Sequence, residues 1–236
     1  MQSSELPRHA ALVWTWEGKA YSLPLSTQDV LQLARAVNAE GYPQNGVAWA
    51  LVQRAAWLKT KGIEISLGRL VQQYAQPLNP RWFPEGDLHQ KQVAGLVATG
   101  KLDEAKAENR AADTRKTKAG ASWADLSPST HEVIREVLSG KDASPVVGAV
   151  HYWATRGDDF STNQVRRPDL ILLDRGFGYQ KTNVFFAVPG SQHFGGVAVI
   201  NGNESFPPDG NLVMAGMGSG PIIAGLAVYF AWKWLS

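Results

Sequence analysis

The stretch Leu33-Ala34-Arg35-Ala36-Val37-Asn38-Ala39-Glu40-Gly41 predicts a helix that ends on an acidic residue. Its apolar side chains recur at helical spacing, and Glu40 falls close to the face that the helix buries. Gly41 and Pro43 then stop the helix, so the carboxyl of Glu40 is expected in the last turn, beside a break in the chain.

The predicted position of Glu40 favours the protonated form of its carboxyl. The negative end of the helix dipole and partial removal from water both raise the pKa of an acid. A carboxyl that holds its proton near neutral pH is suited to act as a general acid, for example on a glycosidic oxygen. The alternative, on this helix alone, is a helix-terminal glutamate that simply faces solvent.

Three further segments share a recognisable order with this helix. Gly46-Val47-Ala48-Trp49-Ala50-Leu51-Val52-Gln53-Arg54-Ala55 predicts a second apolar helix after a short turn. Far downstream, Val147-Gly148-Ala149-Val150-His151-Tyr152 follows a helix that ends at Gly140. Pro189-Gly190-Ser191-Gln192-His193-Phe194 forms a late turn.

Together these segments resemble the SleB-type cell wall hydrolases, the spore-cortex-lytic family, over residues 30 to 195. The family signature is a helix ending in Ala-Glu, a Gly-containing turn, a helix closing on Asn-Arg, a Gly-Ala-Thr-His-Tyr/Phe segment and a Gly-Asn-His-x-Phe turn. The chain departs from it at Gln53 in place of Asn, at Val150 in place of Thr and at Ser191-Gln192 in place of the Gly-adjacent Asn. An insertion of roughly residues 85 to 125 separates the blocks.

The resemblance implies a lysozyme-like lytic transglycosylase that acts on the MurNAc–GlcNAc strands of peptidoglycan and needs no cofactor or metal. Glu40 would protonate the leaving oxygen, and the same group as a base would help the muramic acid 6-hydroxyl close onto C1. His151, Tyr152 and His193 are the expected substrate-binding residues. For the two histidines, a buried ring bonded to backbone is the alternative.

Composition excludes several other classes. A formal charge of +2 gives no broad electrostatic case for nucleic acid. The absence of cysteine rules out a disulfide framework and a thiol-ligated metal. The five histidines show neither HxxH nor HExxH spacing, and no GxSxG elbow or P-loop is present.

Helices followed by short strands predict an α+β fold that is mainly helical. The expected elements are a hairpin over 13–23, helices from 66 to 77, over 100–118 and over 127–140, and strands over 170–173, 184–188 and 197–200. The domain prediction is an N-terminal hairpin or extension over residues 1–25 and a cell wall hydrolase domain over 26–205.

The two ends of the chain differ in character. Met1 to Ala10 is polar and shows no ordinary secretory signal. No charged residue lies between Asp209 and Lys233. Residues 211–235 are therefore expected to form an anchoring segment, in which residues 212–235 contact a membrane or a hydrophobic partner in a phage virion. A glycine-rich buried core segment is the alternative.

Two other functions are consistent with the same residues. One is a non-catalytic, membrane-associated structural or penetration protein that keeps a glycan-binding, lysozyme-like scaffold. The other is an amidase or peptidase that acts on the stem peptide.

Overall fold

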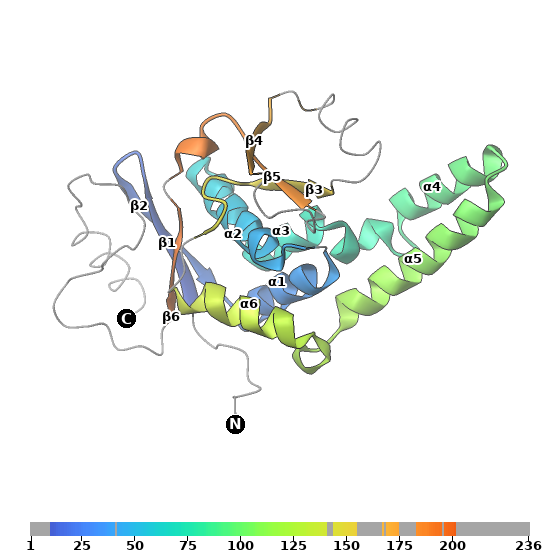
Figure 1. Cartoon of the computed structure of the whole chain (residues 1–236), viewed down its shortest axis with the longest axis horizontal. Coiled ribbons are helices and arrows are strands. Elements are labelled where there is room, and N and C mark those ends of the chain that lie inside the picture. Colours follow the sequence, from blue (N-terminus) through green and yellow to red (C-terminus); the bar gives the residue numbers. More distant parts are fainter. Residues whose placement is uncertain are drawn as a thin grey trace.

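Helices form most of the fold, and two small antiparallel sheets lie against them, as Figure 1 shows for the whole chain. This confirms the mainly helical α+β class. The computed structural model describes residues 10–40, 42–140, 144–154, 167, 169–174, 183–194 and 196–201.

The first three helices are α1 (Thr27–Ala39), α2 (Gln44–Thr60) and α3 (Leu67–Tyr74). Ser26 caps α1, and its side chain and that of Asp29 complete a capping box. Ser66 caps α3 in the same way, by accepting a hydrogen bond from a backbone N–H of the first turn. The second helix is longer than its predicted apolar stretch, because it continues through residues 56–60.

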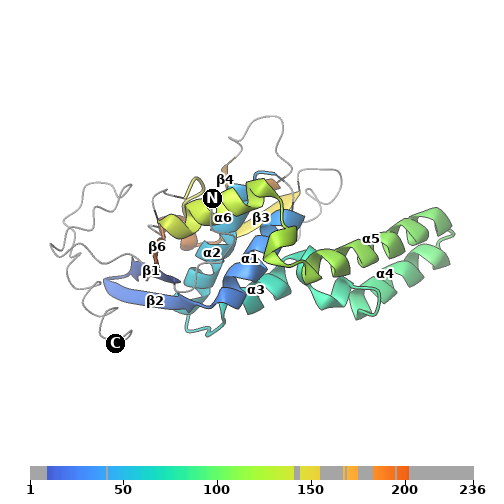
Figure 2. The same cartoon turned by 90° about the horizontal axis from the view of Figure 1, so that it is seen from below.

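Helices α4 (Asp87–Ala98) and α5 (Leu102–Gly120) form an antiparallel hairpin, the arm, that projects from the body in Figures 1 and 2. The arm occupies the insertion expected between residues 85 and 125, and α5 confirms the solvated helix predicted there. Helix α4 was not predicted, since its exposed apolar and polar residues give only a weak helical period. Two short 3₁₀ turns, Gln76–Leu78 and Pro80–Trp82, connect α3 to the arm.

Helix α6 (Pro128–Ser139) confirms the last predicted helix. Ser127 accepts a hydrogen bond from the Thr130 N–H, and Pro128 occupies the first turn, where it has no N–H to leave unpaired. Gly140 ends the helix with φ of 65°, a conformation that costs glycine little.

The first sheet has the strand order β2-β1-β6 and the second β3-β5-β4. The predicted hairpin is present as β1 and β2, which pair from Ala10↔Leu25 to Trp16↔Lys19. Strand β6 pairs with the free side of β1, so residues near 200 share a sheet with the hairpin. The bounds are β1 Ala10–Trp16, β2 Lys19–Leu25, β3 His151–Ala154, β4 Ile171–Asp174, β5 Asn183–Ala187 and β6 Ala198–Asn201.

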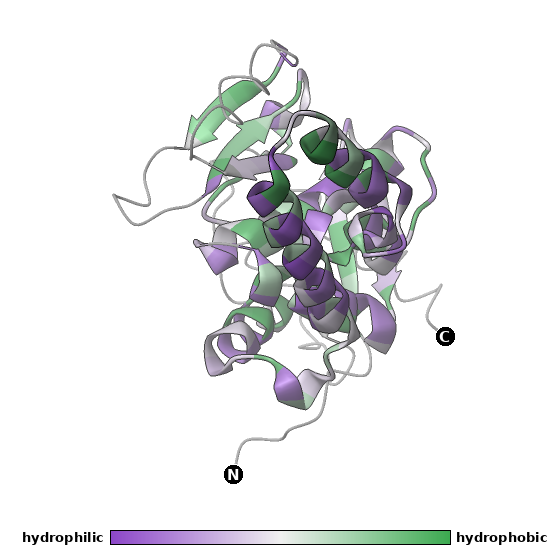
Figure 3. Cartoon of the chain, turned by 90° about the vertical axis from the view of Figure 1, so that its right-hand side faces the viewer, coloured by the Kyte–Doolittle hydropathy of each residue, from purple (hydrophilic) through white to green (hydrophobic). Residues whose placement is uncertain are grey.

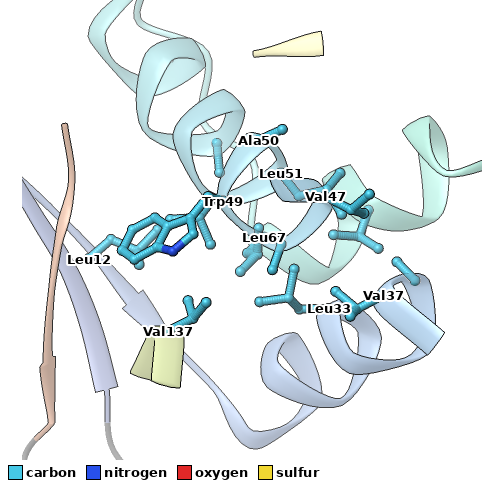
Figure 4. Packing of buried hydrophobic residues seen from close by; sticks show 14 of the residues in the cluster. Leu12, Leu33, Val37, Val47, Trp49, Ala50, Leu51, Leu67 and Val137 are labelled. Carbon is cyan, nitrogen blue, oxygen red and sulfur yellow. The ribbon is translucent and has the colours of Figure 1, made fainter. Parts of the chain in front are cut away.

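Helix α2 is the centre of the main hydrophobic core (Figure 4). Trp49 extends from α2 toward Leu12 of β1, and Leu33 of α1 and Leu67 of α3 pack on the same helix. Figure 3 shows hydrophobic colour on the strands and hydrophilic colour over much of the helices that face the viewer. A helix buried on most sides explains why α2 reads as a nearly continuous apolar run.

Gly46 lets the second sheet approach the beginning of α2. A Cβ atom at this position would lie 2.5 Å from Cζ of Phe185 on β5, closer than two carbon atoms can pack. The backbone N–H of Asn183, at the start of β5, also donates to the carbonyl of Tyr42, at 3.1 Å. The chain just after Glu40 is therefore fixed against this sheet.

Residues 212–235, for which a membrane anchor or a core segment was expected, lie outside the described residues. Within the described part, no helix combines the length and the apolarity needed to traverse a bilayer.

Candidate functional site

Glu40 lies directly after the last residue of α1, where the sequence predicted it. Its backbone N–H donates to the carbonyl of Ala36 at 2.8 Å, and its extended conformation (φ −78°, ψ 164°) ends the helix. The residue is partly buried. The carboxyl therefore keeps a limited contact with solvent while most of its surroundings are protein.

Tyr152 of β3 contacts this carboxyl directly. Its hydroxyl donates a hydrogen bond to Oε1 of Glu40 at 3.1 Å. Tyr152 is only 6 % exposed, and its ring lies against that of Phe185. The fold thus joins two of the predicted segments, which are 112 residues apart in the chain.

Burial is the main reason why the pKa of Glu40 is raised to about 7. The hydrogen bond from Tyr152 and the positive charge of Lys118, in the last turn of α5, favour the carboxylate and oppose this rise. Burial also raises the pKa of Tyr152 well above its usual value, so its hydroxyl keeps its proton and remains a donor. Near neutral pH, Glu40 is therefore present in both protonation states.

Tyr74, at the end of α3, contacts the backbone and the ring of Tyr152. Its hydroxyl accepts a hydrogen bond from the backbone N–H of Tyr152 at 3.2 Å and lies 2.9 Å from Nδ1 of His151. Burial raises the pKa of Tyr74 to about 12, so this hydroxyl stays neutral. Burial, and then the charge of Arg54, lower the pKa of His151 to about 3, so its ring is neutral as well.

Two consecutive side chains of α2 hold the segment that leads into β3. Gln53 is fully buried; its amide nitrogen donates to the carbonyls of Val146 (3.0 Å) and Ala149 (3.1 Å), and its amide oxygen accepts from the N–H of Gly148 (3.0 Å). Arg54 Nη1 donates to the carbonyl of Val150 at 2.9 Å. The departure from the family pattern at Gln53 therefore falls on a residue that positions the strand carrying Tyr152.

None of the described contacts joins His193 to Glu40. His193 is exposed and ends the short 3₁₀ turn Ser191–His193. Its backbone N–H donates to the carbonyl of Gly190, where an added Cβ atom would lie 3.1 Å from the ring of Trp57. Trp57 is 13 residues after the start of α2, about 20 Å along the helix from the end that adjoins Glu40.

His151 is close to Glu40 only through Tyr74 and Tyr152, and its ring nitrogens contact Tyr74 and Arg54. Its predicted contact with substrate, like that of His193, stays a prediction. Tyr74 and Lys118 are further members of the site that were not predicted. In the sequence Tyr74 was only an apolar helix position, and Lys118 was one of many charges on a solvated helix.

A hollow of about 390 Å³ lies beside the turn after Glu40, between the start of α2 and α6. Tyr42, Asn45 and Glu132 are among its walls, but Glu40 is not, because its carboxyl is directed at Tyr152. Glu40 is therefore not part of this hollow. No group of three or more His, Asp or Glu side chains suited to a metal ion occurs in the described part of the chain.

Comparison with models of protein families, with curated proteins and with solved structures gives no match. The chemistry of the chain must therefore be argued from the site itself.

Proposed function

We propose that the chain is a peptidoglycan-degrading lytic enzyme with a lysozyme-like fold, in which Glu40 is the general acid and base. The observation that carries the proposal is the partly buried carboxyl of Glu40, with its pKa raised to about 7 and the Tyr152 hydroxyl 3.1 Å from Oε1. A group that is half protonated near neutral pH can give and take a proton in successive steps.

The proposed reaction needs one carboxyl group. Protonated Glu40 donates its proton to the oxygen between the two sugars as the bond from that oxygen to C1 of MurNAc breaks. The carboxylate that results accepts the proton of the muramic acid 6-hydroxyl, while O6 forms a bond to C1. The products are a 1,6-anhydro sugar and a free sugar hydroxyl, and Glu40 returns to its protonated state.

The described surroundings of Glu40 fit a scheme that uses one carboxyl group. Inverting and nucleophilic retaining glycosidases use a second carboxylate on the other side of the scissile bond. Among the described residues, no other carboxylate hydrogen-bonds to Glu40 or Tyr152, or affects the pKa of Glu40. Tyr152 holds the carboxylate formed in the first step, which keeps it in place for the second.

The test is the clearing of purified sacculi by the wild type and by Glu40→Gln. Loss of a general acid is expected to slow clearing by about 10²- to 10⁴-fold. Glu132→Gln, an exposed glutamate on α6, is the matched control and should clear at the wild-type rate. Mass spectrometry of the released material should find anhydro-muropeptides. Free stem peptides would indicate an amidase or peptidase, and no soluble product would indicate a non-catalytic glycan-binding scaffold.

We further propose that residues 212–235 hold the enzyme to a membrane or to a hydrophobic surface of a virion. The support is the uncharged run between Asp209 and Lys233, which ends in aromatic residues.

A further inference from the structure

Arg54 is a partly buried cation with no carboxylate partner among the described residues. Its guanidinium lies 4.1 Å from the centre of the Tyr74 ring, and Nη1 donates to the carbonyl of Val150. Its Nε is buried without a hydrogen bond. Buried charges in proteins are normally paired, so a guanidinium in this state is suited to bind an anion.

The positive charge of a second guanidinium, that of Arg167, affects His151 and Arg54. Arg167 lies just before β4, and its carbonyl accepts from the N–H of Leu170 at 3.1 Å. Its positive charge opposes protonation of His151 and lowers the pKa of Arg54 in addition to the larger effect of burial. Both cations therefore act on His151, whose ring is neutral at neutral pH, and Arg167 also repels Arg54.

Among the described residues, Asp169 supplies the negative charge that acts on His151. Asp169 binds Arg167 through two hydrogen bonds, both 2.9 Å long, and this exposed pair is screened by water. Arg54 has no such partner in the described part of the chain. Of the described charged groups that act on His151, two are guanidinium groups and one is a carboxylate, so positive charge is in excess around its neutral ring.

We propose that Arg54 and Arg167 form a subsite for a carboxylate of the substrate, connected to Glu40 through Tyr74 and Tyr152. Guanidinium groups match carboxylates in shape and charge, and an anion between them would relieve their repulsion. The inference rests on the proposed function, because the carboxylate is that of the lactyl group of muramic acid or of its stem peptide. The subsite would distinguish peptidoglycan from an uncharged glycan of the same backbone.

Binding to a Glu40→Gln protein tests the subsite without any cleavage. The probes are N-acetylmuramic acid, its neutral methyl ester and N-acetylmuramyl-L-alanyl-D-glutamate, titrated by NMR at low salt. An anionic probe should bind about tenfold more tightly than the ester, and the preference should fall as salt is added. Preference for the acid identifies the lactyl carboxylate, and preference for the dipeptide alone identifies the stem peptide.

Two exposed residues allow matched variants. Arg167→Gln should reduce the preference for the anion by about threefold to tenfold, and Asp169→Asn should increase it, because Arg167 loses its competing partner. Arg81 and Asp87 form a similar exposed pair at the base of the arm, so Arg81→Gln and Asp87→Asn are the controls and should change nothing.

Equal binding of acid, ester and dipeptide, or no binding of any of them, would overturn the subsite, as would an unchanged preference in Arg167→Gln. Failure of the proposed function looks different. In that case wild-type protein releases no anhydro-muropeptides from sacculi, whatever the binding preference of Glu40→Gln.

Discussion

Replacement of Tyr152 by Phe removes a single hydroxyl from the site and should move the pH dependence of activity upward. The hydroxyl donates to Oε1 of Glu40 at 3.1 Å and so stabilises the carboxylate, the form that cannot act as an acid. The ring keeps its place between Phe185 and Tyr74, so the change in packing is small.

The size of the effect follows from the hydrogen bond that is lost. A bond to a charged group is worth about 1.5–3 kcal/mol, and 1.36 kcal/mol corresponds to one pH unit. Because this bond, at 3.1 Å, is slightly longer than the usual O–H···O range and Glu40 is only partly buried, we take the lower limit, about one pH unit. The pKa of Glu40, about 7 in the wild type, should therefore be about one pH unit higher in the variant.

The assay is the rate of sacculus clearing between pH 5 and 9, with each protein scaled to its own maximum. Glu40 must be protonated to donate, so activity falls as the pH rises through its pKa, and the fall should occur about one pH unit later in Tyr152→Phe. A ¹³C NMR titration of the Glu40 carboxyl in the free protein measures the same pKa without substrate. Tyr21→Phe on β2, a tyrosine that stacks on Trp14, is the control and should titrate as the wild type does. An alkaline limb that stays in place or moves to lower pH would refute the role given to Tyr152.

Three further outcomes are expected. Glu40→Gln should be more stable than the wild type by up to about 3 kcal/mol at pH 8 and no more stable at pH 4. The reason is that the raised pKa of Glu40 makes the wild type lose stability as the pH rises from 4.5 to about 7. Urea unfolding of both proteins at the two pH values measures this, and the same stability difference between them at pH 4 and pH 8 would contradict it. Gly46→Ala should destabilise the protein by about 1–3 kcal/mol by pushing on Phe185, whereas Gly95→Ala, which meets open space in α4, should stabilise it by about 0.5–1 kcal/mol in the same denaturant titration. Deletion of residues 211–236 should leave a chain that clears sacculi but no longer partitions into membranes, and misfolding would instead place the segment in a core.

Local signals in the sequence were sufficient for most of the elements. Ser26, Ser66 and Ser127 each precede a helical pattern and each caps a helix, since a serine oxygen there pairs with an N–H of the first turn. Gly140 ends α6 for an equally local reason, its left-handed conformation. Helix α4 was missed because the arm buries few apolar residues, and its pattern carries little information about what it packs against.

The sequence also determined where Glu40 would lie, since a helix period and a stop signal are properties of neighbouring residues. Only the tertiary structure decided what surrounds the carboxyl. The hydroxyl of Tyr152, the bonds of Gln53 and the clustering of Arg54 with Arg167 join residues far apart in the chain, and no local pattern encodes such contacts. The position of the turn that carries His193 was likewise decided by tertiary packing, because Gly190 of this turn lies close to Trp57 of α2. A pKa depends on burial and on nearby charges, and both are set when distant segments pack together.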